Sequence, residues 1–158
     1  MKTLVVFYSR TGTTKKVAEK LADKLSAESE EIIDTLDRSG IMGFLYSGRD
    51  AMRRRLTKIE APQKNPADFD LVIIGTPIWA WNVSAPVRTY LTQQREKLPQ
   101  VAFFCTMGGS GYKKVFREMY KIIRKKPKAF LYLTTQEVTG ISEIFKEKLN
   151  SFTKKLQN

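Results

Sequence analysis

The feature that most constrains the fold is a run of five apolar residues, 4–8, that breaks abruptly into glycine and hydroxyl residues. The run is rich in β-branched and aromatic side chains and too short for a buried helix, so it predicts a central strand covered on both faces. Apolar residues then recur at helical spacing from Val17 to Leu25, and Thr13 or Thr14 can cap this helix. The pattern predicts a strand, a loop and a helix in succession.

The loop of residues 9–14 has the properties of a phosphate site. It lies at a helix N-terminus, where free backbone N–H groups and the helix dipole favour an anion. Gly12 lets the backbone approach closely, and the hydroxyls of Ser9, Thr11, Thr13 and Thr14 are further donors. A plain strand-to-helix turn with a Ser/Thr cap is the alternative for this loop taken alone.

Composition removes several classes of chemistry. The chain has 158 residues, one cysteine and no histidine. Its length fits a single domain over residues 1–158. Cys105 is the single cysteine, so an internal disulfide is excluded, and we expect it to be buried at a strand end. The lack of histidine removes the Cys-His dyad and the commonest zinc ligand. We therefore expect no metal site and no catalytic side chain. Chemistry is expected to come from a cofactor. No segment has the pattern of a signal peptide or a membrane span, which predicts a cytoplasmic protein.

The net charge of +12 favours acidic partners or polyanions, although it indicates no particular fold. Much of the excess lies in residues 49–55 and in residues 113–128, where eight basic residues accompany one acid, Glu118. A solvated helix face is the simpler interpretation of each run.

Four further strands and four further helices are expected. The strands are 30–36, 70–75, 101–105 and 129–133, and the helices are a short basic one at 50–56, one from Ser84 or Ala85 to about 97, one after Tyr112 and one from about Ser142. Residues 37–60 are the least regular part, and glycines among exposed aromatics there suit a flap, a contact surface or a satellite of the core. The order predicts an α/β fold with helices on both faces of a doubly wound, five-stranded parallel sheet.

Two more loops resemble the first in position. Residues 76–82 follow the third strand and hold both tryptophans, and residues 106–112 follow the fourth strand and hold three glycines. Large flat side chains at the carboxyl ends of parallel strands suit a planar ligand, while packing on neighbouring helices is the alternative. In a sheet of order 2-1-3-4-5 the three loops converge on one crevice at the switch point.

With these three loops the sequence resembles the flavodoxin family over essentially its whole length. Residues 9–14 match the family's phosphate loop, residues 75–82 resemble its second flavin loop, and residues 105–112 take the place of its third. The resemblance implies a three-layer α/β/α fold and FMN as cofactor, with backbone groups near Ile78 and Trp81 bonded to flavin N5. It implies cofactor-binding roles for Ser9, Arg10, Thr11, Gly12, Thr13, Thr14, Thr76, Pro77, Ile78, Trp79, Ala80, Trp81, Asn82, Met107, Gly108, Gly109 and Tyr112.

The chain departs from the family in charge, since flavodoxins that act as low-potential carriers are typically acidic. A positive surrounding stabilises the reduced, anionic flavin and makes its potential less negative. The leading hypothesis is an FMN-binding electron-transfer protein whose partner is a redox protein, acidic in character, or a small quinone-like acceptor. The alternatives are an NAD(P)H-dependent quinone or nitro-compound reductase and, least favoured, a basic module that binds nucleic acid or acidic protein. The sequence does not indicate the oligomeric state.

Overall fold

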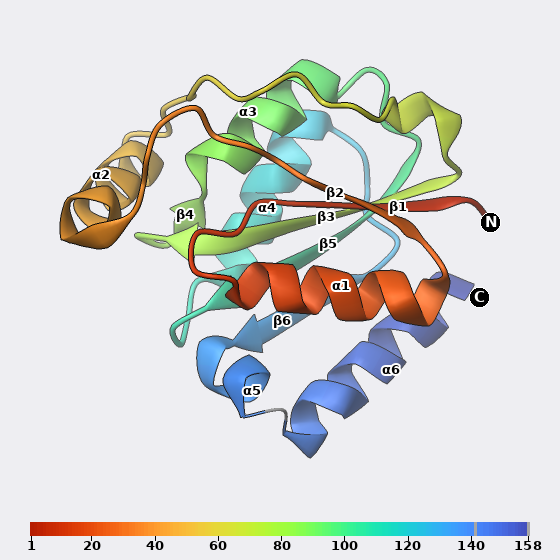
Figure 1. The fold of residues 1–158 in the computed structure, drawn as a ribbon. Coiled ribbons are helices and arrows are strands. Elements are labelled where there is room, and N and C mark those ends of the chain that lie inside the picture. The colour runs from red at the N-terminus through yellow and green to blue at the C-terminus, as the bar shows by residue number, and fades with distance from the viewer. Residues whose placement is uncertain (141, 158) are drawn as a thin grey trace.

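The computed structural model describes residues 1–140 and 142–157 and has three layers, with a parallel sheet between two layers of helices (Figure 1). The five parallel strands follow the order β2-β1-β3-β5-β6. Their bounds are Thr3–Phe7 for β1, Glu28–Glu31 for β2, Leu71–Trp79 for β3, Gln100–Met107 for β5 and Phe130–Thr134 for β6. This agrees with the order predicted for the parallel strands.

Helices cover both faces of the sheet. One face carries α1 (Thr13–Leu25), α5 (Thr135–Thr139) and α6 (Glu143–Gln157), and the other carries α3 (Ala85–Gln94) and α4 (Tyr112–Ile123). Helix α2 (Gly40–Met52) projects beyond the carboxyl ends of the strands, and a short 3-10 turn, η1, spans Pro66–Asp68 (Figure 1). Among the described residues, no helix is long and apolar enough to cross a membrane.

The alternation of side chains along each strand divides the core into two clusters. In β1, Leu4 and Val6 pack toward α3 and α4, whereas Val5 and Phe7 pack toward α1 and α6. Because the central strands are buried on both faces, they read in the sequence as continuous apolar runs, which is why they were predicted well. Cys105 is buried, as expected, although β5 continues through Thr106 and Met107 beyond it.

The second strand was placed wrongly. The prediction chose residues 30–36 for their apolar residues, but β2 is the polar segment 28–31, in which Glu28 pairs with Leu4 and Glu31 with Phe7. An edge strand is held by backbone hydrogen bonds along one side and needs no apolar alternation, so its signal is weak. Ile33 and Leu36, which motivated the prediction, are both exposed.

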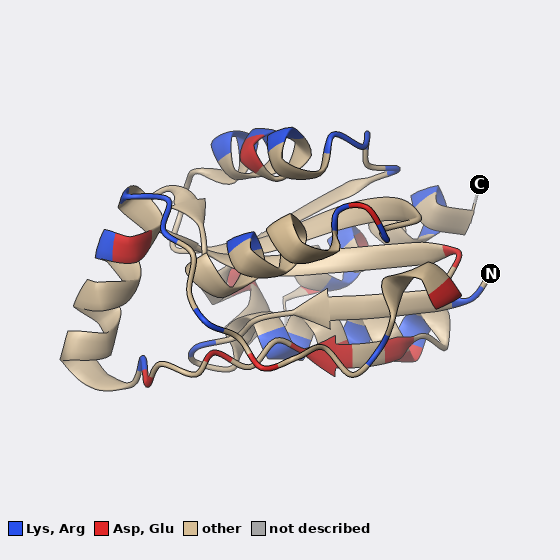
Figure 2. Cartoon of the chain, turned by 90° about the horizontal axis from the view of Figure 1, so that it is seen from above, with Lys and Arg blue, Asp and Glu red and all other residues tan. Residues whose placement is uncertain are grey.

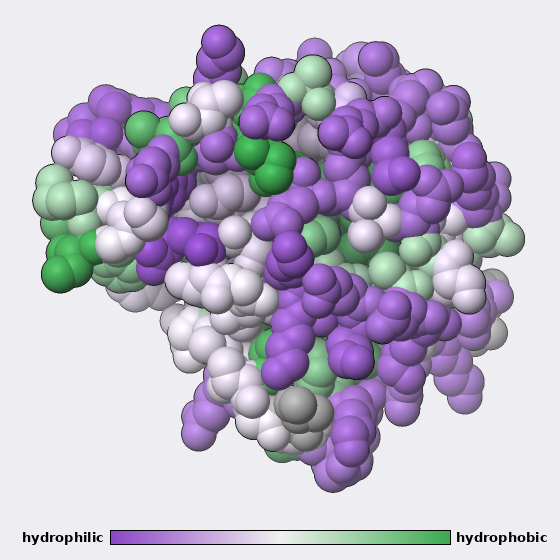
Figure 3. All heavy atoms as spheres, in the orientation of Figure 1, coloured by the Kyte–Doolittle hydropathy of each residue, from purple (hydrophilic) through white to green (hydrophobic). Residues whose placement is uncertain are grey.

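The segment before residue 60 was also misread. Helix α2 covers residues 40–52, so Ile41, Phe44 and Tyr46 are helical, and the basic Arg53 lies at its C-terminal cap. The glycines suggested breaks, but Gly43 instead packs so closely on the Arg38 backbone that a Cβ could not fit. Figure 3 shows the apolar side chains of this helix exposed on the projecting edge of the molecule.

Two elements were missed. The two-residue strand β4 (Asn82–Val83) pairs antiparallel with the end of β3, so the sheet has six strands and not the five predicted. Helix α5 follows β6 directly, and its start is fixed by a capping box in which Thr134 and Glu137 each accept a hydrogen bond from the other's backbone N–H.

Candidate functional site

A cleft lies where the carboxyl ends of β1, β3 and β5 meet, and it consists of three neighbouring hollows that share Ile78. The innermost, about 130 Å³, is lined by Arg10, Thr11, Thr13, Thr14, Phe44, Pro77, Ile78, Trp79, Thr106, Met107, Gly108 and Thr135. A second hollow of about 260 Å³ lies between the tip of the β3–β4 hairpin and the loop of residues 108–110. A third of about 530 Å³ lies between α2 and the hairpin. The three predicted loops therefore converge on one site.

The inner end of the cleft is built by the start of α1. The N-cap of this helix is Gly12, at φ +94°, and within the described chain no side chain caps the helix, contrary to the expectation for Thr13 or Thr14. The N–H groups of the first turn are therefore left without intrahelical partners and are available to a ligand. Ser9 shapes the loop, because its Oγ accepts a hydrogen bond of 3.1 Å from the Gly12 N–H.

Contacts between elements hold this loop in place. The hydroxyls of Thr14 and Thr106 are 2.8 Å apart, which ties the start of α1 to the end of β5. The Arg10 guanidinium donates to the carbonyl of Arg38 at 3.2 Å and lies 5.5 Å from the centre of the Phe44 ring. A cation and several hydroxyls thus surround the free N–H groups, an arrangement suited to a phosphate.

The second loop is a tight β-hairpin. Trp79 pairs with Asn82, so Ala80 and Trp81 form a two-residue turn, with φ angles of +45° and +59°. Turns of this kind favour Asn-Gly, because both central residues adopt the left-handed region. An alanine and a tryptophan here carry backbone strain, and strained backbone of this sort concentrates at binding sites.

The Trp81 ring lies at the mouth of the cleft. It is 62% exposed, and its indole Nε1–H donates to Ser110 Oγ at 3.1 Å, which joins the second loop to the third. Gly111, at φ +107°, permits this approach, since a Cβ there would lie 3.2 Å from Trp81 Cδ1 and 3.4 Å from Ile78 Cγ2.

Trp79, by contrast, is held deep in the cleft wall. Its ring meets the edge of the Tyr8 ring at a centroid distance of 5.4 Å, and the Arg38 guanidinium lies 5.2 Å from it. Arg38 is buried and paired with Asp34 at 2.5 Å and with Asp50 at 3.0 Å. Burial, followed by the charge of Asp34, raises the pKa of Tyr8 to about 12, so this phenol stays protonated.

A buried carboxylate anchors the base of the hairpin. Glu118 on α4 accepts a hydrogen bond of 3.0 Å from the Val83 N–H, and its other oxygen lies 2.8 Å from Arg88 and 3.2 Å from Arg54. This ion-paired group holds the end of β4 on α4 and so anchors the hairpin that carries the turn.

The structure divides the predicted residues into three sets. Those that line the cleft are Arg10, Thr11, Thr13, Thr14, Pro77, Ile78, Trp79, Ala80, Trp81, Met107, Gly108 and Gly109. Ser9 and Gly12 do not line the cleft but shape the loop of residues 9–14, through the hydrogen bond from the Gly12 N–H to Ser9 Oγ and the positive φ of Gly12.

Three predicted contacts lie elsewhere. Thr76 is fully buried, and its hydroxyl is 3.0 Å from Ser84 Oγ. Asn82 is buried and donates to the carbonyl of Ala80 at 2.6 Å, within the hairpin. Tyr112 turns away from the cleft and stacks on Tyr132 with a centroid distance of 3.8 Å. The prediction treated residues 76–82 and 106–112 as open loops, but β3 continues through Trp79, Asn82 belongs to β4 and Tyr112 begins α4. Each of these three side chains therefore packs within an element of the fold.

In the two smaller hollows, sequence reasoning missed four residues, namely Phe44, Thr106, Ser110 and Thr135, and it also missed the residues of α2 and its C-terminal cap that line the third hollow. Phe44 carried a signal, as an aromatic residue among glycines in a segment that suited a flap. Thr135 carried none, because its place depends on α5 packing beside β5, where its hydroxyl donates to the Met107 carbonyl at 3.3 Å.

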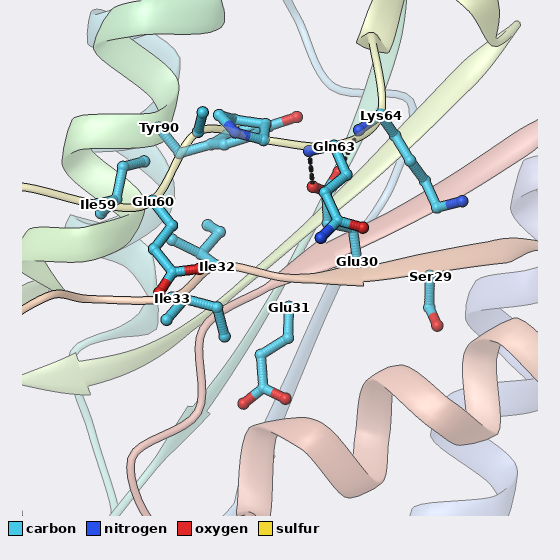
Figure 4. A pocket seen from close by; sticks show the side chains of 12 residues that line it. Ser29, Glu30, Glu31, Ile32, Ile33, Ile59, Glu60, Gln63, Lys64 and Tyr90 are labelled. Atoms are coloured by element: carbon cyan, nitrogen blue, oxygen red, sulfur yellow. Dashed lines mark hydrogen bonds between the residues drawn. The ribbon is translucent and has the colours of Figure 1, made fainter.

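A separate cavity of about 280 Å³ lies at the other side of the sheet, beside the edge strand β2 (Figure 4). Its lining includes Glu30, Glu31 and Glu60, and Glu30 accepts hydrogen bonds from the backbone N–H groups of Gln63 and Lys64. None of the predicted flavin-contacting residues lines it.

The sheet, with helices on both faces and a cleft at its switch point, defines a doubly wound α/β protein. Comparison with solved structures shows which fold of this class it has. A scan of the sequence against models of protein families finds no match, and a search of curated proteins finds none. The chain is similar to a flavoprotein from Lactobacillus acidophilus in complex with FMN, with 24% identity and a TM-score of 0.73 over 88% of this chain and 97% of that one.

Two further solved structures extend the likeness. One is flavodoxin 2 from Bacillus cereus, in its oxidised form, with 13% identity and a TM-score of 0.61 over 98% of this chain and 97% of that one. The other is an NADH:FMN oxidoreductase in its apo form, with 14% identity and a TM-score of 0.59 over 99% and 90%. The protein therefore has the flavodoxin-like fold.

Proposed function

We propose that the protein binds FMN in the cleft and transfers electrons. The observation that carries the proposal is the convergence of three loops on one cleft, with uncapped N–H groups, hydroxyls and Arg10 at its inner end, Ile78 and Trp79 in its wall and Trp81 at its mouth. The likeness to flavoproteins, one of them in complex with FMN, supports the same function.

The residues of the cleft fit the cofactor in charge and in hydrogen-bonding capacity. The N–H groups at the start of α1, with Thr11 and Thr13, would hold the phosphate without a metal ion. The hairpin would present backbone groups of residues 78–81 to the edge of the ring system, and Trp81 would cover a face of it. When bound, FMN supplies the redox chemistry, and the protein supplies orientation and tuning of the potential.

The phosphate assignment is tested by comparing FMN with riboflavin, which lacks the phosphate. We expect the protein to bind FMN about 100-fold more tightly, because a phosphate with several charge-assisted hydrogen bonds contributes roughly 3 kcal/mol. Titration of the apoprotein, followed by quenching of flavin fluorescence, measures both affinities. Equal affinities would refute the assignment.

A pair of variants sharpens this test. Thr13→Val removes one hydroxyl from the phosphate end and should lower the affinity for FMN about tenfold while leaving that for riboflavin unchanged. Thr153→Val on α6 is the matched control, since Thr153 bonds the carbonyl of Asn150, in the same helix. If both variants lose the same affinity, the hydroxyl of Thr13 plays no part in binding.

An NAD(P)H-dependent reductase is a second candidate function, favoured by the hollow between α2 and the hairpin. This hollow of about 530 Å³ is large enough for a small-molecule substrate, and Phe44, Leu45 and Met52 make its α2 side apolar. Steady-state oxidation of NADH or NADPH by the FMN-loaded protein, with a quinone as acceptor, separates the two functions. A rate no higher than that of free FMN would reject the reductase and leave electron transfer as the remaining candidate function.

A further inference from the structure

A groove runs between α4 and the edge strand β6, on the side of α4 away from the hairpin. It has a volume of about 720 Å³ and is lined by five aromatic rings, Tyr112, Phe116, Tyr120, Phe130 and Tyr132. Three of these residues are well exposed, with Tyr120 and Phe130 each close to half accessible. An apolar surface of this size on a protein with a net charge of +12 calls for an occupant.

The rim of the groove is strongly basic. Lys113, Arg117, Lys126, Lys128 and Lys155 line it, and no Asp or Glu of the described chain does. Figure 2 shows α4 as a helix with blue bands and a single red one, Glu118, which is buried and paired with Arg88 and Arg54. The electrostatic potential of the groove is therefore positive, because no acidic side chain of the described lining balances the basic ones.

The opposite edge of the sheet has the reverse character. Strand β2 carries three glutamates in four residues, and the cavity beside it is lined by Glu30, Glu31 and Glu60 (Figure 4). On the β2 edge Glu28 pairs with Lys2 and Lys64, and Glu31 pairs with Lys15. The charges of this edge are therefore largely balanced, whereas the lysines of the groove face no acid of the described chain. An acidic molecule is thus attracted more strongly to the β6 edge, which orients it as it approaches.

The rings favour a peptide over a nucleic acid. Tyr112 and Tyr132 stack face to face at 3.8 Å, and Phe116 packs on Phe130 at 4.9 Å, so each of these rings has one face covered by another ring. Lys148 Nζ also lies 4.7 Å from the centre of the Tyr132 ring, and Lys113 Nζ lies 6.0 Å from that of Tyr112. Bases bind by stacking on open ring faces. Covered faces leave edges and gaps, which accept aliphatic or aromatic side chains of a protein.

We propose that this groove is a docking surface for an acidic segment of a partner protein, with apolar side chains that pack on the rings and carboxylates that pair with the lysines of the rim. The groove follows α4, whose 12 residues extend about 18 Å, the length of about six extended residues. A short segment is therefore enough to fill it.

The groove also adjoins the cleft described above. Its first ring, Tyr112, directly follows Gly111, which contacts Trp81 at the cleft mouth. A partner seated on the groove would lie next to the third loop of the cleft. Docking itself does not depend on a bound flavin, so it is tested separately from the proposed function.

The test uses labelled peptides of about eight residues and fluorescence anisotropy. One peptide alternates Glu with Leu and Phe, a second replaces the apolar residues with Gly, and a third replaces Glu with Lys. We expect the first to bind in a saturable way, the second about tenfold more weakly, and the third not at all. Raising the salt concentration from about 50 to about 300 mM should weaken the binding of the first peptide.

Matched charge reversals locate the binding. Lys126 and Lys155 lie on the rim, and Lys126→Glu and Lys155→Glu should each lower the affinity for the first peptide roughly fivefold. Lys20 is exposed on α1, away from the groove, and Lys20→Glu should change this affinity less than about twofold. Tyr120→Ser should remove the preference for the apolar peptide. All four variants should bind FMN as the wild type does.

Several results would overturn the proposal. They are the absence of saturable binding, equal weakening by Lys20→Glu, no preference for apolar side chains, and tighter binding of oligothymidylate than of the acidic peptide. Self-association in light scattering that the peptide fails to compete with would assign the groove to a second copy of the chain instead.

Discussion

Replacing Gly111 with alanine tests how the third loop positions Trp81. Gly111 has φ +107°, which costs an L-residue about 1–2 kcal/mol. The new Cβ would also lie 3.2 Å from Trp81 Cδ1 and 3.4 Å from Ile78 Cγ2, closer than the usual 3.5–4.0 Å between carbons. Moving these side chains adds about 1 kcal/mol, so we expect a total loss of about 2–3 kcal/mol.

Thermal unfolding of the apoprotein measures this loss. For a chain of this length, each kcal/mol shifts the midpoint by about 2–4 °C, so the Gly111→Ala variant should unfold about 5–10 °C lower. Its indole fluorescence should change because Trp81 moves, and its affinity for FMN should fall about tenfold because the cleft mouth is distorted.

Gly12→Ala is the control for the backbone strain. Gly12 has φ +94°, but a Cβ there would meet nothing within 4 Å. This variant should lose about 1–2 kcal/mol and leave the indole fluorescence of the apoprotein unchanged. Equal destabilisation in the two variants, with unchanged fluorescence in both, would refute the argument that Gly111 is required for the approach of Trp81.

Three other predictions concern strain, pH and reactivity. Changing Ala80-Trp81 to Asn-Gly should stabilise the apoprotein by about 1–2 kcal/mol in urea unfolding, because the strain in the turn is relieved. The same change should weaken FMN binding, because the indole ring is lost. A variant less stable than the wild type would contradict the conclusion that the turn is strained. Burial raises the pKa of Glu137, but hydrogen bonds from Lys148 and the Thr134 N–H outweigh it, so the folded pKa lies below the usual value. Glu137→Gln should therefore cost about 1 kcal/mol of stability at neutral pH. The difference in stability from the wild type should disappear as the pH falls through the lowered folded pKa, and a difference that stays constant with pH would contradict this. Burial raises the pKa of the Cys105 thiol, so a disulfide reagent at about pH 8 should modify it in urea but not in the folded protein; rapid modification of the folded protein would contradict its burial.

The central part of the fold was predictable because its signal is local. Strands β1, β3 and β5 are buried on both faces, so each is a continuous apolar run in the sequence. In each amphipathic helix, the spacing of the apolar residues indicates which face is buried. The edge strand β2 and the helix α2 were misplaced because neither is specified by burial. Backbone pairing with β1 holds the first, and most of the apolar side chains of the second are exposed.

The site was predictable as a set of loops and less so as a set of side chains. The loops were found because each breaks an apolar run with glycine and hydroxyl residues. The side chains of Thr76, Asn82 and Tyr112 do not line the cleft, because β3 continues past its apolar run, Asn82 lies in β4 and Tyr112 begins α4. The direction of a side chain depends on where such elements begin and end.

The sequence alone determined the doubly wound topology and the place of the cleft, because strand burial, helical spacing and the switch-point rule all follow from the order of residues along the chain. Only the tertiary structure decided the strained turn at Ala80 and Trp81, its anchor Glu118 and the approach of Trp81 to Gly111. It also decided that the basic run after Tyr112 borders an aromatic groove. These features join residues far apart in the sequence, and such contacts depend on packing geometry that a local pattern does not contain.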